Sequence, residues 1–300
     1  MSVPAARFAA QAKVNLALHI GGRGADGYHE LATIFARVDL ADDVVVRTLR
    51  SGTRIRVTRD GVPDESVGPA EKNLGLRAAL AYMDEARWPS GCAIDIEKRI
   101  PVGAGLGGGS SDAGSVLRGL DSLAPRPLGE ARLLRIAARL GADVPFLTST
   151  APLALGTGRG DVIEPLPALA PRWLAIVTPP FSVATADAYA WLDAHRESSR
   201  ETPRLDAGSL RRGSRSWDDL AAIAGNDFDP VIAQRFPIME SYRTALEQAG
   251  ARLAMLSGSG SAMFGLFENE PDVAEIARAC NAPVLPARVP ARVVATSGNE

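Results

Sequence analysis

The chain has 300 residues, 46% of them hydrophobic and 23% charged, and its 33 basic and 35 acidic side chains leave a formal net charge of −2. This composition is typical of a folded chain of one large or two ordinary domains, and it excludes a disordered protein. The near-zero charge predicts no nucleic-acid partner, because such partners are bound by a surplus of basic side chains.

Membrane insertion, export and a protein-built metal centre are not expected. The longest stretches without a charged residue, 144–158 and 253–267, are shorter than the roughly 18–20 residues of a membrane-spanning helix. No apolar segment of signal-peptide length precedes Lys13. The two cysteines, Cys92 and Cys280, are too few for a disulfide framework, and the three histidines lack metal-ligand spacing. We expect a cytoplasmic protein with no membrane partner; the oligomeric state is left open.

The first half of the chain is predicted to open with strands. Apolar and polar residues alternate from Ala12 to Ile20, which is typical of a strand, and Lys13 and Asn15 lie on its polar face. A glycine-rich loop follows at 21–27. The further elements expected are strands at 33–40, 44–49 and 53–58, a helix at 73–86, a strand at 92–97, helices at 110–120 and 128–140, and strands at 151–155 and 161–166.

The second half is predicted to form another unit, so that residues 1–156 are one domain and residues 157–300 the other. Along the whole chain, strands and helices mix without strict βαβ alternation, and the fold class is therefore α+β. The expected elements are a strand at 173–177, helices at 185–194, 217–224, 230–236, 239–248 and 271–280, strands at 252–256, 262–267 and 288–295, a loop at 196–214 and a turn at 257–260.

The most informative segment is a glycine-rich loop between the strand at 92–97 and the helix at 110–120. Five glycines fall within residues 103–109, so backbone N–H groups can surround an anion without clashes from Cβ atoms. Ser110 or Ser111 is predicted to cap the following helix, whose N-terminus adds partial positive charge. A strand that leads directly into a capped helix favours a polyphosphate site over a mobile linker.

Other phosphate-binding classes fit this loop poorly. Gly103, Gly105 and Gly108 formally satisfy the dinucleotide fingerprint, but that reading needs an acidic residue at the end of a second strand. Asp121 instead falls in or just after a helix, which disfavours a nicotinamide oxidoreductase. The P-loop motif and the protein-kinase signatures are missing.

The block Pro101-x-x-x-Gly105-Leu106-x-x-x-Ser110-Ser111 resembles the central signature of the GHMP kinases, named for galactose, homoserine, mevalonate and phosphomevalonate kinases. Its Gly-Gly-Gly-Ser-Ser form is similar to the branch that phosphorylates a cytidine diphosphate-linked polyol. Segments 12–16 with 26–31, 140–145 and 257–264 resemble further family blocks in the same order. The resemblance implies an N-terminal ribosomal protein S5 domain 2-like unit and a C-terminal ferredoxin-like α/β sandwich. It also implies phosphoryl transfer from ATP, with Mg²⁺, to a small-molecule alcohol.

The same resemblance implies the site residues. Asp143 matches the catalytic base and Lys13 its electrostatic partner, although position alone suggests a turn-stabilising Asp and a solvated strand Lys. Tyr28 and His29 match the pair that recognises cytosine. The implied ATP-binding residues are Asn73, Lys98, Pro101, Val102, Gly103, Ala104, Gly105, Leu106, Gly107, Gly108, Gly109, Ser110 and Ser111. The implied acceptor-binding residues are Asn15, Tyr28, His29, Thr185, Tyr189, Gly258, Ser259 and Gly260.

Some questions stay open at the level of sequence. No metal ligand is assigned, with Ser111 the one candidate, and Asp112 stands where the family commonly has a neutral residue. A carboxylate there would repel phosphates unless it points away from them or contacts the metal. Two alternatives remain: a sister kinase of the mevalonate or homoserine type, which gives no reason for Tyr28 and His29, and a non-catalytic nucleotide-binding protein, which is expected to have lost Lys13 or Asp143.

Overall fold

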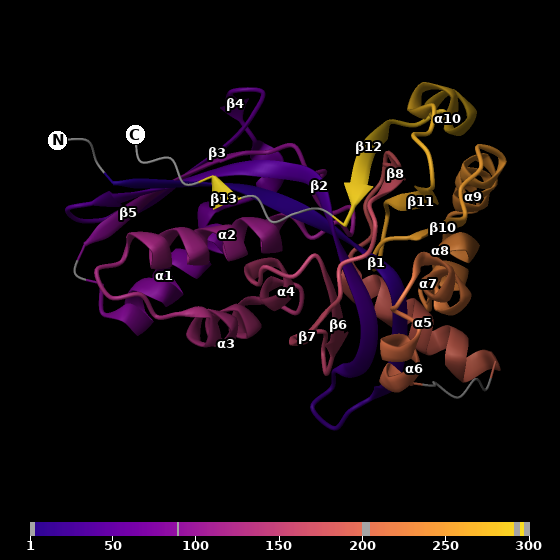
Figure 1. Ribbon diagram of the computed structural model, residues 1–300, viewed down its shortest axis with the longest axis horizontal. Coiled ribbons are helices and arrows are strands. Elements are labelled where there is room, and N and C mark those ends of the chain that lie inside the picture. The colour runs from indigo at the N-terminus through magenta and orange to yellow at the C-terminus, as the bar shows by residue number, and fades with distance from the viewer. Residues whose placement is uncertain (1–3, 89, 200–204, 291–294, 297–300) are drawn as a thin grey trace.

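The computed structural model describes residues 4–88, 90–199, 205–290 and 295–296. Its chain builds two sheets, each with its own set of helices (Figure 1). The elements of the first half are β1 (Ala5–Arg23), β2 (His29–Leu49), β3 (Thr53–Arg59), β4 (Val62–Pro63), α1 (Leu74–Ala86), β5 (Gly91–Glu97), α2 (Gly108–Leu123), α3 (Glu130–Leu140), α4 (Val144–Thr148), β6 (Leu153–Thr157) and β7 (Val162–Leu166). Those of the second half are β8 (Arg172–Val177), α5 (Thr185–Ser199), α6 (Ala207–Arg212), α7 (Trp217–Ile223), β9 (Gly225–Asn226), α8 (Asp229–Arg235), α9 (Ile238–Gln248), β10 (Leu253–Leu256), β11 (Met263–Phe267), α10 (Val273–Cys280), β12 (Val284–Val289) and β13 (Ala295–Thr296).

The first sheet is organised around the long antiparallel pair β1 and β2. Its strand order is β13-β1-β2-β5-β3-β4, with the β6–β7 hairpin attached to β2 and β9 attached to β1. Helices α1, α2 and α3 lie on one side (Figure 1), where their apolar residues form a core with β2 and β5. The other side packs against the second sheet through a core that includes Val14, Leu16 and Phe264. Because both faces of β1 are covered, Lys13 and Asn15 are buried rather than solvated.

The second sheet has the β-α-β-β-α-β topology of a ferredoxin-like fold, which confirms the architecture expected for this half. Its four strands lie in the order β10-β11-β8-β12, and all their pairings are antiparallel. Helices α5, α8, α9 and α10 share one core with its strands (Figure 1), whereas α6 packs on β2 and β6 of the first sheet. The α+β class is likewise confirmed.

The start of α2 differs from the expected one. The helix begins at Gly108 rather than Ser110, and Gly107, with φ of 72°, occupies the N-cap without a side-chain hydrogen bond. The Ser111 hydroxyl instead donates to the Gln11 carbonyl oxygen at 2.7 Å. The predicted cap by Ser110 or Ser111 is therefore wrong, because a left-handed glycine already turns the backbone into the helix.

Several element boundaries also differ. The strands expected at 33–40 and 44–49 are one strand, β2, and the closing strand expected at 288–295 is divided between β12 and β13, with residues 291–294 outside the described residues. The loop expected at 196–214 contains the end of α5 and all of α6, whose Asp206 cap accepts the Ser209 N–H at 2.9 Å. The five-residue α4 was not expected. Helices this short carry too little periodicity to be recognised from sequence.

The division between the two units stays a proposal. The boundary expected after residue 156 falls inside the β6–β7 hairpin, both strands of which belong to the first sheet. We propose that the division lies after Leu166, before β8 opens the second sheet. The second half also returns β9 and β13 to the edge of β1, so the two units share a sheet. Within the described part of the chain, no helix is both long and apolar enough to span a membrane.

Candidate active site

A buried cation and an accessible carboxylate form the centre of the candidate site. Lys13 lies on β1 with a side chain only 3% exposed, and its ammonium nitrogen is 3.2 Å from Asp143 Oδ2. Asp143 precedes the first residue of α4, and its side chain is 31% exposed. A carboxylate that is anchored on one side and open on the other can accept a proton from a bound hydroxyl. The structure thus brings together the two residues expected to carry catalysis.

Lys13 is held in place by a short chain of hydrogen bonds. Its ammonium donates to Asn15 Oδ1 at 2.7 Å, and the Asn15 amide donates to Thr33 Oγ1 at the same distance. The Thr33 hydroxyl donates in turn to the Ala17 carbonyl oxygen at 2.6 Å. Every member of this chain is buried. Asn15, expected to bind the acceptor, therefore also orients the lysine.

The glycine loop lies directly against Lys13. Gly103, Gly105 and Gly107 have φ of 71°, 79° and 72°, and they alternate with Ala104 and Leu106, which are buried and anchor the loop. A Cβ at Gly107 would lie 2.9 Å from Lys13 Cγ, and the Lys13 N–H donates to the Leu106 carbonyl oxygen at 2.9 Å. This close backbone approach, followed at once by the N-terminus of the 16-residue helix α2, forms a cradle suited to phosphates.

The turn at 257–260 closes the site from the second unit. Ser257 donates its hydroxyl to the Gly105 carbonyl oxygen at 3.1 Å. A Cβ at Gly258 would lie 3.2 Å from the Lys13 ammonium nitrogen. The chain therefore brings its first strand, its glycine loop and its C-terminal glycine turn to one place.

Asn226 fixes that turn and was missed at the sequence level. Its amide nitrogen donates to the carbonyl oxygens of Leu256 and Gly258, at 2.9 and 2.8 Å, while its Oδ1 accepts the Phe228 N–H. Its strand β9 runs beside β1. No sequence motif marks a lone asparagine as such a brace, and only the pairing of β9 with β1 places it there.

His29, Tyr189 and Phe228 form a wall of aromatic rings. His29 stacks on Tyr189 with ring centroids 5.0 Å apart and planes 21° apart, and Tyr189 meets the edge of Phe228. His29 Nε2 lies 2.8 Å from Asp193 Oδ1. Burial raises the pKa of Tyr189 to about 12, and the carboxylates of Asp143 and Asp193 add to the rise. The charge of the expected base therefore reaches Tyr189.

The remaining acceptor positions are divided between two places. Thr185, at the start of α5, has its hydroxyl 3.0 Å from that of Ser259, so it joins the C-terminal turn. Tyr28 is 57% exposed, and the guanidinium of Arg159, from the β6–β7 turn, lies 4.4 Å from its ring centroid. Arg159 is a second residue that sequence reasoning missed, since an arginine in a glycine-rich turn carries no distinctive pattern.

Beneath the loop lies a buried ionic cluster formed by Lys98, Asp42 and Asp112. The Lys98 ammonium contacts an oxygen of Asp42 and lies 2.8 Å from Asp112 Oδ2. Asp42 also accepts the N–H groups of Arg99 and Ile100, at 2.6 and 2.8 Å. The expectation that Lys98 contacts ATP is not supported, because two carboxylates enclose its ammonium. Asp42 is the partner that sequence reasoning missed.

Asp112 points into the protein rather than toward the open side of the loop. Its carboxyl is buried, and burial raises its pKa to about 7 against the opposing effect of the Lys98 ammonium. The inward orientation answers the question raised by its position in the sequence, since a carboxyl turned toward Lys98 does not face bound phosphates.

Substitution of Asp112 by asparagine is expected to change how stability depends on pH. From pH 3.8, the ordinary pKa, to about 7, folded Asp112 retains a proton that the unfolded chain has released. Its stabilising effect is therefore present at low pH and lost as the pH rises through 7. An asparagine side chain cannot ionise, so the melting temperature of Asp112→Asn relative to that of the wild type should rise as the pH increases from 5 to 8, by about 2 °C or more.

Thermal unfolding of both proteins from pH 5 to pH 8 measures this difference. Asp187→Asn is the control, because Asp187 is an exposed carboxylate on α5. A variant that loses stability relative to the wild type as the pH rises would contradict the assignment.

Two other expected nucleotide contacts have structural partners of their own. Asn73 caps α1, with Oδ1 accepting the N–H groups of Gly75 and Leu76 at 2.8 and 3.4 Å. The next residue, Leu74, lies 3.9 Å from the position of a Cβ at Gly109, so the start of α1 adjoins the loop. Ser111 is fully buried and donates to the Gln11 carbonyl, which does not support it as a metal contact.

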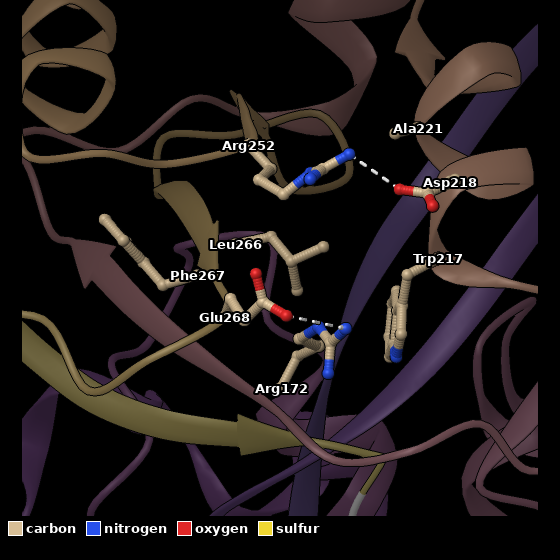
Figure 2. A pocket seen from close by; sticks show the side chains of 8 residues that line it. All are labelled: Arg172, Trp217, Asp218, Ala221, Arg252, Leu266, Phe267 and Glu268. Atoms are coloured by element: carbon tan, nitrogen blue, oxygen red, sulfur yellow. Dashed lines mark hydrogen bonds and ion pairs between the residues drawn. The ribbon is translucent and has the colours of Figure 1, made fainter.

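A small pocket lies elsewhere in the second unit (Figure 2). Its volume is about 80 Å³, and it is lined by Arg172, Trp217, Asp218, Ala221, Arg252, Leu266, Phe267 and Glu268. Both arginines are paired with carboxylates, Arg252 with Asp218 at 2.6 Å and Arg172 with Glu268 at 3.7 Å. The pocket shares no residue with the glycine loop or the Lys13–Asp143 pair, and it is a separate feature.

Comparison with known proteins identifies relatives along most of the chain. Residues 73–150 match the family described as GHMP kinases N terminal domain, and residues 207–284 match GHMP kinases C terminal. A curated protein of Citrifermentans bemidjiense, named 4-diphosphocytidyl-2-C-methyl-D-erythritol kinase, is 42% identical over 275 residues, or 90% of this chain and 94% of that protein.

Solved structures agree with these matches. The crystal structure of a 4-(cytidine 5'-diphospho)-2C-methyl-D-erythritol kinase superposes with a TM-score of 0.76 at 35% identity, covering 94% of this chain and 98% of its own. The structure of a homoserine kinase from Cytophaga hutchinsonii superposes with a TM-score of 0.71 at 19% identity, covering 97% and 95% of the two chains. At that identity the second likeness concerns the fold alone.

Proposed function

This chain belongs to the GHMP kinase family, and on that premise we propose that it phosphorylates the 2-hydroxyl of 4-diphosphocytidyl-2-C-methyl-D-erythritol. ATP is the phosphoryl donor, and the products are the 2-phosphate and ADP, in the non-mevalonate route to isoprenoid precursors. The observation that carries the proposal is the Lys13–Asp143 pair, 3.2 Å apart, directly beside the glycine loop. The relatives named for this reaction support the choice of acceptor.

The reaction needs a group that takes the proton of the acceptor hydroxyl. As the hydroxyl oxygen attacks the γ-phosphorus, the bond from that phosphorus to the β-phosphate oxygen breaks, and the hydroxyl proton passes to the Asp143 carboxylate. The Lys13 ammonium holds that carboxylate in place and offsets negative charge that develops at the attacking oxygen. Asn15 keeps the ammonium in position through its 2.7 Å hydrogen bond.

The loop at 101–107 and the N-terminus of α2 form the phosphate-binding part of the proposal. The left-handed glycines bring the backbone close to the bound phosphates, and Gly108, Gly109 and Ser110 offer N–H groups of the first helical turn. When Mg²⁺ accompanies ATP it supplies positive charge that neutralises the phosphates. The described residues include no group of three metal-binding side chains, and Asp112 is turned inward, so the ion would be held by phosphates and water.

The aromatic wall is the proposed recognition site for the cytosine ring. Tyr189 in the wall is partly exposed and the neighbouring Tyr28 is exposed, so these two rings are the surfaces offered to a base. A base stacked on an aromatic side chain gains about 1–3 kcal/mol. The effect of the Asp143 carboxylate on the pKa of Tyr189 supports placing recognition of the base and chemistry at the hydroxyl in one continuous site. A mevalonate- or homoserine-type acceptor has no base that would use this wall.

A cytoplasmic location is part of the proposal. Cys92 and Cys280 are free and buried, which is consistent with the reducing compartment expected from the sequence.

Measurement of ADP release with three acceptors tests the proposal. We expect turnover with 4-diphosphocytidyl-2-C-methyl-D-erythritol and at least about 100-fold lower kcat/KM with mevalonate or homoserine, because loss of a well-packed recognition group costs about 3 kcal/mol. Turnover with mevalonate or homoserine, but not with the cytidine substrate, would show that the protein is a sister kinase of the mevalonate or homoserine type. ATP binding without turnover of any of the three would point to a non-catalytic nucleotide-binding protein.

A further inference from the structure

Arg37 is a fully buried arginine on β2 that the reaction described above does not use. None of the ion pairs found among the described residues includes it, and two of its three nitrogens, Nε and Nη2, donate to backbone carbonyls, while Nη1 is buried without a hydrogen-bond partner. Nη2 donates to the carbonyl oxygens of Phe146 and Ser149 at 2.9 and 3.0 Å, and Nε donates to that of Ala151 at 3.3 Å. Because a buried guanidinium is costly unless its donors are satisfied, this placement calls for an explanation.

The carbonyls that Arg37 binds belong to the C-terminal end of α4 and the residues just beyond it. The last carbonyls of a helix have no partner within the helix and carry partial negative charge, which a cation stabilises. Burial and the nearby guanidinium of Arg118 lower the pKa of Arg37 to about 9, so it is still protonated at neutral pH. Arg37 therefore acts as a charged cap for α4.

The opposite end of α4 carries the expected base. Asp143 immediately precedes the helix, makes no capping hydrogen bond with its side chain, and is paired with Lys13. A five-residue helix does not hold its own position, because helices this short are unstable without outside contacts. The location of the Asp143 carboxylate thus depends on what fixes α4.

Two residues that are paired across β1 and β2 contact the two ends of α4. Lys13 on β1 and Arg37 on β2 are directly opposite in the antiparallel register, so their side chains project from the same face. One reaches Asp143 before the helix, and the other reaches the carbonyls at its end. On a neighbouring rung, Phe35 stacks on Phe146 with centroids 5.0 Å apart, and the Arg37 guanidinium lies 5.1 Å from the Phe146 ring.

From this geometry we propose that Arg37 is a positioning residue for catalysis, which holds α4 so that the Asp143 carboxylate stays beside Lys13. The inference rests on the proposed role of Asp143 and extends it to a residue at the opposite end of α4. A displacement of 1 Å at a reacting group can lower the rate about 100-fold. Replacement of Arg37 should therefore affect kcat much more than substrate binding.

The test compares Arg37→Met and Arg37→Lys with the wild type. We expect Arg37→Met to lower kcat by about 10- to 100-fold while each KM changes by less than about threefold, and Arg37→Lys to recover part of the loss because an ammonium can still bind the carbonyls. Arg172→Met is the control. Arg172, on β8, is paired with Glu268 in the separate pocket of the second unit and does not touch α4, so its loss should leave kcat nearly unchanged.

A double-mutant cycle separates positioning from general stability. In an Asp143→Asn background, Arg37→Met should reduce the residual kcat no further, since the group it positions is already gone. An equal reduction in both backgrounds, or an unchanged kcat in the wild-type background, would overturn the proposal. If Arg37→Met does not fold, Arg37→Lys is carried through the same cycle.

The acceptor in these assays is whichever one the wild type phosphorylates. Failure of the cytidine substrate assignment would therefore appear in the wild type, whereas failure of the Arg37 inference appears only in the ratio of variant to wild type.

Discussion

Asp143→Asn should lower kcat by about 10²- to 10⁴-fold, the range that a positioned general base contributes, while ATP still binds. Asparagine preserves the size of the side chain but cannot accept the hydroxyl proton. The glycine loop, which is proposed to hold ATP, does not depend on this carboxylate, because Gly107 packs on the stem of Lys13 and on Leu147. Steady-state ADP release gives kcat, and calorimetric titration with a non-hydrolysable ATP analogue gives the affinity.

Lys13→Met should give a loss of the same order, and the double variant should lose little more than either single one. The two side chains act as one unit, and the effects of such residues do not add. Asp84→Asn is the control, because Asp84 is an exposed carboxylate on α1. An Asp143→Asn protein that keeps most of its activity would remove the base from the proposed mechanism, whatever happens to Lys13.

The sequence predicts those parts of the site whose functional groups are neighbours within one short segment or match a family motif. The glycine run at 103–109 indicates a phosphate cradle by itself, and the family resemblance adds Lys13 and Asp143, which the structure brings to 3.2 Å. The distance between these two could not be derived from spacing, because 130 positions separate them along the chain. It arises from the packing of α4 on the β1–β2 pair.

The parts that sequence reasoning missed share a physical cause, which is that each depends on a partner far away in the chain. Lys98 is predicted to contact the nucleotide, but in the structure its ammonium pairs with Asp42, which lies on another strand. The sequence suggests that Asp112 repels bound phosphates, because it does not show that this carboxyl points toward Lys98. Asn226 and Arg37 belong to no sequence motif, and only the strand register shows which backbone carbonyls they bind. A different cause applies to α4 and α6, whose five and six residues are too few to show a helical pattern of apolar residues.

Gly105→Ala is expected to have the largest effect of any single substitution in the loop. Gly105 has φ of 79°, and a Cβ there would lie 2.1 Å from the Ser257 carbonyl oxygen and 3.1 Å from that of Gly260. These atoms are backbone and cannot move as the end of a side chain would. Left-handed strain and overpacking together should cost about 2–4 kcal/mol of unfolding free energy.

The same substitution should also weaken ATP binding, by about tenfold or more, because the clash separates the two glycine motifs. The Ser257 hydroxyl bond to the Gly105 carbonyl, at 3.1 Å, is one of the contacts that join the loop to the C-terminal turn. Parting them would leave the cradle in a different shape from the one that fits the phosphates. Chemical denaturation gives the stability, and titration with the ATP analogue gives the affinity.

Gly109→Ala provides the stability control within the same glycine run. Gly109 lies in the first turn of α2, its φ is not positive, and the nearest atom to an added Cβ is Leu74 Cδ1 at 3.9 Å. Alanine is the better helix former, so this variant should be as stable as the wild type or slightly more stable. Equal stability of the two alanine variants would mean that the loop does not press on the turn at 257–260. In that case the glycine at 105 would serve only to open space for the phosphates.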